Sequence, residues 1–140
     1  MRVEKIVVDT NVLISAALNS RGKPRAAVDA IRSQNGMPVF SEETFAELRH
    51  RFSSPKFNQY VGHDLRAVWL AQIQSVSLWV SITGAKLGCR DRNDDMLLES
   101  ALMGEADCLV TGDTDLLIMS KFQLIPIIAP AEFLNRVNNG

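Results

Sequence analysis

The sequence has 140 residues and no apolar run long enough to span a bilayer, which predicts one globular domain over residues 1–140 and no membrane segment. Hydrophobic residues make up 46% and charged residues 22%, as is typical of a soluble protein, and the net charge of −1 argues against a nucleic-acid binder with a uniformly basic surface. Two cysteines, Cys89 and Cys108, are too few for a disulfide framework and favour a reducing cytoplasm.

The elements predicted along the chain alternate between strands and helices. The first half predicts a strand over 5–9, helices over 11–18 and 24–33, a strand over 38–40 and a helix over 41–52. The second half predicts a helix over 64–76, a strand over 78–83, a helix from Asp94 or Asp95 to 103, a strand over 109–111, a helix over 113–119, a strand over 124–128 and a closing helix from Pro130. Because parallel strands need helical crossovers, this alternation predicts an α/β fold: a three-layer α/β/α sandwich with a central parallel sheet of four to five strands.

The helix over 64–76 carries a regular apolar stripe. Its members recur at helical spacing: Leu65, Val68, Trp69, Ile73 and Val76. Such a stripe is usually the side of a helix that packs on the core, and we interpret it in that way.

Acidic residues stand where two predicted strands end. Asp9 closes the apolar run over 6–8, and Asp113 closely follows the run over 108–110. In an open parallel sheet, ligands bind outside the carboxyl ends of the strands. Several carboxylates in one small pocket repel each other unless a cation neutralises them, and Mg²⁺ or Mn²⁺ takes oxygen ligands. These positions therefore predict a divalent metal site, in which the Thr111 hydroxyl can hold a carboxylate; helix capping by either Asp is the alternative.

The run over 91–95 places three acids before an apolar helical segment. Asp95 has Leu98 three positions later, so we expect it near the core-facing side, where an unpaired charge is normally excluded. Asp95 is therefore the predicted metal ligand, and Asp91 or Asp94 is the predicted N-cap.

Glu47 and the basic residues are less distinctive by pattern. Glu47 borders the buried stripe of the helix over 41–52, and periodicity alone favours a solvated surface residue. If four acids occupy a metal pocket, twelve acids remain against fifteen Lys and Arg, which leaves the outer surface at about +3. Each basic cluster is either a solvated face or a phosphate contact. The clusters are Arg21, Lys23 and Arg25; Arg49 and Arg51; and Lys86, Arg90 and Arg92.

Four segments taken together resemble the PIN-domain family of metal-dependent nucleases. They are Asp9-Thr10-Asn11-Val12, residues 44–48 with Glu47, the cluster over 91–95, and Leu109-Val110-Thr111-Gly112-Asp113. Their order and spacing match the family over nearly the whole chain, and the resemblance is closest to the VapC-type toxins of toxin–antitoxin pairs. One departure is Arg92, which stands where related sequences often have proline.

The resemblance implies a ribonuclease that cleaves single-stranded RNA with Mg²⁺ or Mn²⁺. It implies four catalytic acids, Asp9, Glu47, Asp95 and Asp113, and metal ligation by Asp9, Asp95, Asp113 and Asp115, with Asn11 and Thr111 in support. We further predict that Arg21, Lys23 and Arg25 bind the RNA backbone near the pocket mouth. The expected partners are RNA, a protein antitoxin and a second copy of the chain. The dimer is also suggested by the apolar residues Phe52, Phe57, Tyr60 and Val61, for which ordinary core packing is the alternative.

Two other functions fit parts of the sequence. A phosphatase of the haloacid-dehalogenase type also has a nucleophilic Asp after its first strand, but it needs a second Asp two positions later, where Asn11 stands. A PIN-like scaffold that binds a partner without cleaving RNA would not require the intact acids. Cleavage of labelled RNA that depends on Mn²⁺ would separate the ribonuclease from the binding module.

Overall fold

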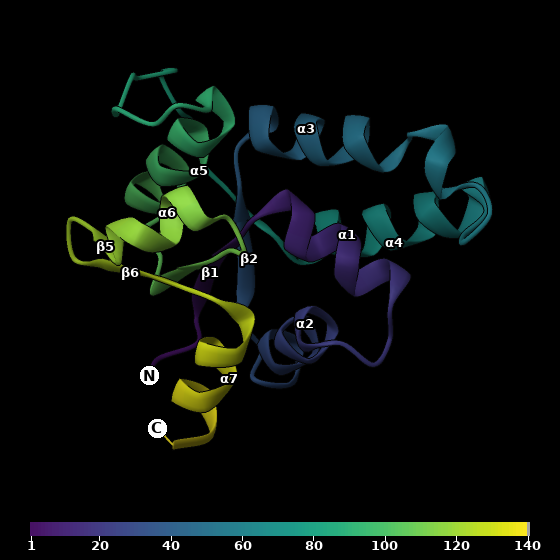
Figure 1. Cartoon of the computed structure of the whole chain (residues 1–140), viewed down its shortest axis with the longest axis horizontal. Coiled ribbons are helices and arrows are strands. Elements are labelled where there is room, and N and C mark those ends of the chain that lie inside the picture. Colours follow the sequence, from purple (N-terminus) through teal and green to yellow (C-terminus); the bar gives the residue numbers. More distant parts are fainter. Residues whose placement is uncertain (140) are drawn as a thin grey trace.

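One six-stranded sheet forms the centre of the molecule in the computed structural model, which describes residues 1–139 (Figure 1). The strands are β1 (Lys5–Val8), β2 (Met37–Phe40), β3 (Leu78–Trp79), β4 (Cys108–Val110), β5 (Lys121–Phe122) and β6 (Ile125–Ile128). The helices are α1 (Thr10–Leu18), α2 (Lys23–Ser33), α3 (Glu42–Phe52), α4 (His63–Val76), α5 (Arg92–Met103), α6 (Thr114–Met119) and α7 (Pro130–Asn139), with a short 3₁₀ helix, η1 (Pro55–Phe57), after α3.

The sheet is parallel except at one edge. Its order is β3-β2-β1-β4-β6-β5, and only β5 runs antiparallel to its neighbour. The predicted α/β fold is therefore confirmed, with five parallel strands. The prediction misses β5, which has two residues and turns into β6 through Gln123 at φ 57°, without the Gly or Asn that usually marks such a turn. The strand predicted over 78–83 is too long, because only Leu78–Trp79 pairs with β2.

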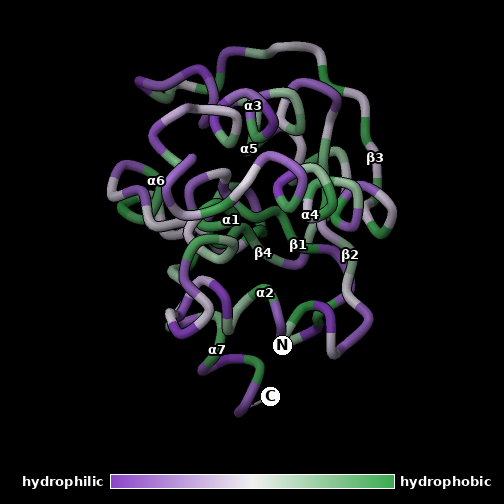
Figure 2. The backbone as a smooth tube through the Cα atoms, turned by 90° about the vertical axis from the view of Figure 1, so that its right-hand side faces the viewer, coloured by the Kyte–Doolittle hydropathy of each residue, from purple (hydrophilic) through white to green (hydrophobic). Residues whose placement is uncertain are grey.

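Alternating side chains of the strands build two cores, one on each face of the sheet. Ile6 and Val8 of β1 lie in the core formed with α1, α2, α3, α4 and α7, whereas Val7 lies in the core formed with α5 and α6. Figure 2 shows hydrophobic stretches of α1, β1 and β4 in the middle of the molecule and hydrophilic stretches around them. Helices thus cover both faces, which gives the three layers of the predicted sandwich.

The apolar stripe of α4 is only partly core, which corrects the prediction. Ile73 is buried and Trp69 packs against the core, but Leu65, Val68 and Val76 are 66%, 54% and 55% exposed. The buried side of the helix is rotated toward Ile73 and Arg66, so one edge of the stripe faces outward. Among residues 1–139, no helix combines the length and apolar character that a membrane crossing requires.

The topology fixes where a ligand site can form. From β1 the chain adds β2 and then β3 on one side, and it then crosses to β4 on the other side of β1. The order of the sheet reverses at this point, and the crevice between the carboxyl ends of β1 and β4 is the usual binding position in open α/β sheets. Asp9 lies there, and its amide donates to the Val110 carbonyl at 2.9 Å.

Candidate functional site

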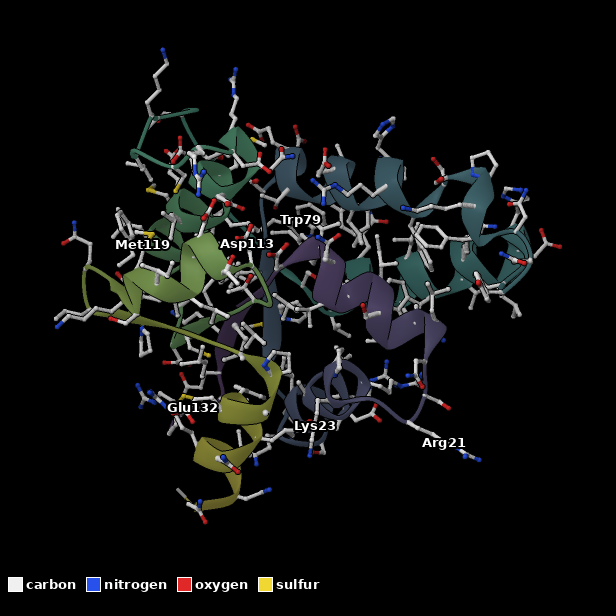
Figure 3. All side chains as sticks on the ribbon, in the orientation of Figure 1. Arg21, Lys23, Trp79, Asp113, Met119 and Glu132 are labelled. Atoms are coloured by element: carbon white, nitrogen blue, oxygen red, sulfur yellow. The ribbon has the colours of Figure 1, made fainter. Side chains whose placement is uncertain are left out.

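Acidic side chains from four parts of the chain meet at the carboxyl ends of β1 and β4. Asp9, Glu47, Asp94 and Asp113 line one small cavity of about 40 Å³. Figure 3 shows Asp113 near the middle of the molecule, with oxygen atoms gathered beside it. The remaining lining residues are Thr10, Asn11, Thr44, Arg51, Asp91, Asn93, Met96 and Leu97. We call this cavity the acidic pocket.

Thr111 connects the two acids that follow β1 and β4. Its hydroxyl donates to Asp9 Oδ2 at 2.7 Å and accepts from the Asp113 amide at 3.0 Å. Asp113 is also the N-cap of α6, because its Oδ1 accepts from the Asp115 amide at 2.8 Å. The predicted support by Thr111 is thus present, and Asp113 combines capping with a place in the pocket, as a carboxylate with two oxygens can.

One side of α3 supplies Glu47 and Arg51 to the pocket. The helix begins at a capping box in which Ser41 and Thr44 exchange hydrogen bonds. Glu47 pairs with Arg51 four residues later, and Arg51 Nη1 donates to Asn11 Oδ1 at 3.1 Å. The Glu47 side chain is only 24% accessible, so the surface position favoured by periodicity is wrong and the position implied by the family resemblance agrees with the structure.

The acid that α5 contributes is Asp94 and not Asp95, which corrects the prediction. Asp91 is the N-cap of the helix, with its Oδ1 accepting from the Asn93 amide at 2.9 Å. Asp94 is 5% exposed and lines the acidic pocket. Asp95 is equally buried but faces the segment before the helix, where its Oδ1 accepts from the Cys89 amide at 3.1 Å. The prediction placed Asp95 on the core-facing side correctly but did not foresee that a nearby loop supplies its partner.

Glu99 lies one turn after Asp95 and fixes the same irregular segment, residues 80–91. Its Oε2 accepts from the amide and the hydroxyl of Thr83, both at 2.8 Å, and its Oε1 accepts from the amides of Gly84 and Ala85 at 3.1 and 3.2 Å. Gly84 has a φ of 81°, a backbone conformation that favours glycine. Sequence reasoning missed Glu99; its i, i+4 spacing from Asp95 was the available signal.

The two groups of acids differ in their electrostatics. Burial and then the charges of Asp113, Asp91 and Asp9 raise the pKa of Asp94 to about 7. Burial also raises the pKa of Asp9, although the Thr111 hydrogen bond opposes this shift. The pKa of Glu99 is lowered, chiefly by the Thr83 amide. For Asp95, burial acts to raise the pKa, but hydrogen bonds from Cys89 outweigh burial and lower it. The acidic pocket therefore holds negative charge that Arg51 compensates only in part, whereas hydrogen-bond donors stabilise the charges of Asp95 and Glu99.

Asp115 lies outside the pocket lining and pairs with Arg90, the two atoms Oδ1 and Nη2 being 2.7 Å apart. The structure therefore does not support its predicted place among the metal ligands.

The cluster of Arg21, Lys23 and Arg25 does not lie at the pocket mouth, contrary to the prediction. Figure 3 shows Arg21 and Lys23 well away from Asp113. Arg25 pairs with Asp29 at 3.3 Å and donates to the Ala16 carbonyl at 3.3 Å. The nine-residue helix α1 carries the chain away from the sheet edge before this cluster begins.

The donor set of the pocket fits a hard divalent cation. Within residues 1–139, no three Asp, Glu, His or Cys side chains form a ready-made metal cluster. Mg²⁺, however, is usually held by only one or two carboxylates and keeps several waters. The buried carboxylates of Asp9 and Asp94 could supply those ligands, with the half-buried Asp113 beside them, and the raised pKa of Asp94 is in keeping with charge that a cation would offset.

Comparisons with known proteins agree with the geometry. Residues 5–115 match the PIN domain family. The chain is also 32% identical over 114 residues to an uncharacterized protein of Methanocaldococcus jannaschii, a match that covers 81% of this chain and 73% of that protein. No solved structure gives a significant match.

Proposed function

The chain belongs to the PIN domain family, and we propose that it is a Mg²⁺- or Mn²⁺-dependent endoribonuclease that cleaves single-stranded RNA in the cytoplasm. PIN domains are generally nucleases, which makes phosphodiester hydrolysis the class of reaction. The observation that carries the proposal is the convergence of Asp9, Asp94 and Asp113, from three separate parts of the chain, in one small pocket at the point where the strand order reverses.

In this proposal, Asp9, Asp94 and Asp113 hold the metal, and Asp94 takes the role first predicted for Asp95. When bound, a divalent ion lowers the pKa of a coordinated water and offsets negative charge on the phosphate. Thr111 fixes the direction of the Asp9 carboxylate through its 2.7 Å hydrogen bond. Glu47 lies on the wall formed by α3, where its carboxylate orients the attacking water or accepts its proton.

The rival functions have less support. The residue two positions after Asp9 is Asn11, whose amide oxygen accepts from Arg51, so the second Asp of a haloacid-dehalogenase phosphatase is missing at that position. A scaffold that only binds a partner has no use for a pocket in which acids raise each other's pKa at a cost in stability.

Cleavage of a labelled single-stranded RNA, in Mn²⁺ and in excess chelator, tests the proposal. We expect the wild type to cut the RNA only with metal, and Asp9→Asn to lose this activity. Asp29→Asn is the matched control, since this exposed acid on α2 pairs with Arg25 outside the pocket. Metal-independent cleavage, or none by the wild type, would contradict the proposal.

We also propose that the chain is the toxin of a toxin–antitoxin pair and forms a homodimer. The residues predicted to form the dimer contact differ in exposure. Phe52 is 1% exposed and belongs to the core, whereas Tyr60 is 68% exposed. The outward edge of α4, with Leu65, Val68 and Val76, offers a larger apolar surface. Light scattering should give twice the chain mass for the wild type, and the mass of a single chain for the double variant Leu65→Glu, Val68→Glu.

A neighbouring gene for a short DNA-binding protein would support the proposed antitoxin partner.

A further inference from the structure

A second cavity, of about 740 Å³, adjoins the acidic pocket between α1 and the end of α3. Asn11 and Arg51 line both cavities, so a ligand in one reaches the other without leaving the protein surface. In Figure 1, α1 and α3 extend from the sheet toward the same side. The lining residues are Asn11, Ile14, Ser15 and Leu18 of α1, His50 and Arg51 of α3, and Ser53, Ser54, Pro55, Lys56 and Phe57. We call this cavity the α1–α3 groove.

Whereas the pocket is lined mainly by acidic side chains, the groove is lined by basic ones. Its lining includes Arg51, Lys56 and His50 but no carboxylate among the described residues. The Lys56 ammonium lies 5.1 Å from the centre of the Phe57 ring. Cationic side chains beside an aromatic ring are what grooves for single-stranded nucleic acid use, since cations meet phosphates and rings meet bases. An RNA strand that must enter an acidic pocket needs such a cationic approach.

One wall of the groove is held in place by a buried arginine. Arg66 is 4% exposed, and its guanidinium donates to the carbonyls of Phe52, Ser54 and Val61 and to Asn58 Oδ1. These bonds fix the turn that carries Lys56, so the wall exists before any ligand arrives. A preformed wall reduces the ordering that binding requires.

Arg51 stands at the junction of the two cavities. Its guanidinium pairs with Glu47 on the pocket side and donates to Asn11, while a third of the side chain stays accessible. A planar guanidinium offers five N–H donors and can therefore keep one partner while it binds a phosphate oxygen.

We propose that the α1–α3 groove binds the backbone of single-stranded RNA next to the cleaved bond, with Arg51 contacting the phosphate at the junction and Lys56 the next one along. This inference rests on the proposed ribonuclease function. It replaces Arg21, Lys23 and Arg25 as the RNA-binding cluster.

Binding can be measured apart from cleavage. The probe is a fluorescein-labelled single-stranded RNA oligonucleotide, followed by anisotropy in excess chelator over a series of salt concentrations. We expect Arg51→Ala combined with Lys56→Ala to weaken binding by about tenfold or more, and to lower the salt slope by roughly 1.4, because each lost contact to a single strand contributes about 0.7. Arg51→Lys with wild-type Lys56 should retain most of the salt slope, since it keeps the charge.

Arg49→Ala is the matched control. Arg49 lies on the same helix, but its guanidinium sits 5.0 Å from the centre of the Phe45 ring and lines a different cavity. We expect the affinity of Arg49→Ala for the RNA to stay within about twofold of the wild type, because the variant loses one charge outside the groove. Thermal melts of all variants verify that each one is folded.

The possible results separate this inference from the proposed function. Unchanged affinity and salt slope in the Arg51 and Lys56 variants, from a wild type that cleaves RNA, would overturn the groove and leave the nuclease intact. Selective loss of binding in these variants, from a wild type that never cleaves, would support the groove and contradict the nuclease. Binding of a poly-glutamate peptide in place of RNA, with the same sensitivity to the variants, would assign the groove to an acidic protein partner and overturn the inference.

Discussion

Asp94 and Asp95 are neighbours on α5 and are equally buried, yet their surroundings differ in kind. Burial, and then the facing charges of Asp113, Asp91 and Asp9, raise the pKa of Asp94 to about 7. Asp95 faces the residue 80–91 segment, where hydrogen bonds from Cys89 lower its pKa despite burial. Burial alone therefore does not mark a site residue. An acid supplied with donors holds the structure together, whereas an acid placed among other acids leaves charge for a cation or a proton to offset.

The largest expected effect that separates the two residues is on catalysis. Asp94→Asn should lower Mn²⁺-dependent cleavage of single-stranded RNA by at least about a hundredfold, since even residues that only support metal ligands are worth about 10–100-fold. Asp95→Asn should keep most of the activity because it lies outside the pocket. Rates measured at saturating Mn²⁺ decide this, and a greater loss in Asp95→Asn than in Asp94→Asn would reverse the assignment.

Glu99 provides a test of the structural role of the acids that bind residues 80–91. Glu99→Gln replaces a carboxylate that accepts four hydrogen bonds with an amide that has one acceptor oxygen and brings two donors. We expect the free energy of unfolding to fall by about 2–4 kcal/mol, from lost charge-assisted bonds and unmatched buried donors. Urea denaturation measures the change. Glu105→Gln, a change at an exposed acid after α5, is the control and should move stability by less than about 0.5 kcal/mol.

A smaller effect of the difference between Asp94 and Asp95 is the pH dependence of folding stability in the metal-free protein. Asp94 has a pKa of about 7 when folded against 3.8 as its ordinary value. Between these values the folded state binds a proton that the unfolded state does not, so stability falls as pH rises from about 4 to 7 and then levels off. At about 1.4 kcal/mol per pKa unit, the full shift would correspond to about 4 kcal/mol, and because solvent in the open pocket screens the charges we expect a loss of roughly 1–2 kcal/mol from this group.

Urea denaturation in chelator at several pH values measures this trend against that of Asp94→Asn. The difference in stability between the variant and the wild type should grow as pH rises toward 7, because the amide has no proton to lose. A difference that is constant across this range would show that Asp94 ionises in the folded protein as it does in the unfolded chain.

The contrast also explains which parts of the molecule the sequence predicts. Apolar runs that alternate with helical segments indicate the parallel sheet. Asp9 and Asp113 follow the carboxyl ends of β1 and β4 as expected. Those features depend on local order along the chain. The short strand β5 and its turn at Gln123 have no local signal of the usual kind.

The choice between Asp94 and Asp95 is beyond local pattern for a physical reason. Both acids occupy the first turn of α5, and one step of about 100° around the helix separates their side chains. Which of the two side chains points into the pocket depends on where residues 80–91 lie. Glu99 fixes those residues through hydrogen bonds from Thr83 and Gly84. Tertiary hydrogen bonds therefore decide the roles of two adjacent identical residues.

The most direct test of this account is the thermal shift on adding Mn²⁺ to Asp94→Asn and Asp95→Asn. A ligand that binds only the folded state at a hundred times its Kd adds roughly 2.7 kcal/mol to stability, so the wild type should melt at a higher temperature with Mn²⁺ than in chelator. We predict that Asp95→Asn starts lower than the wild type, by about 1 kcal/mol for the lost charged acceptor, and keeps the full shift. Asp94→Asn should start higher, because repulsion in the pocket is relieved, and gain little. A full shift in Asp94→Asn together with a lost shift in Asp95→Asn would contradict the account.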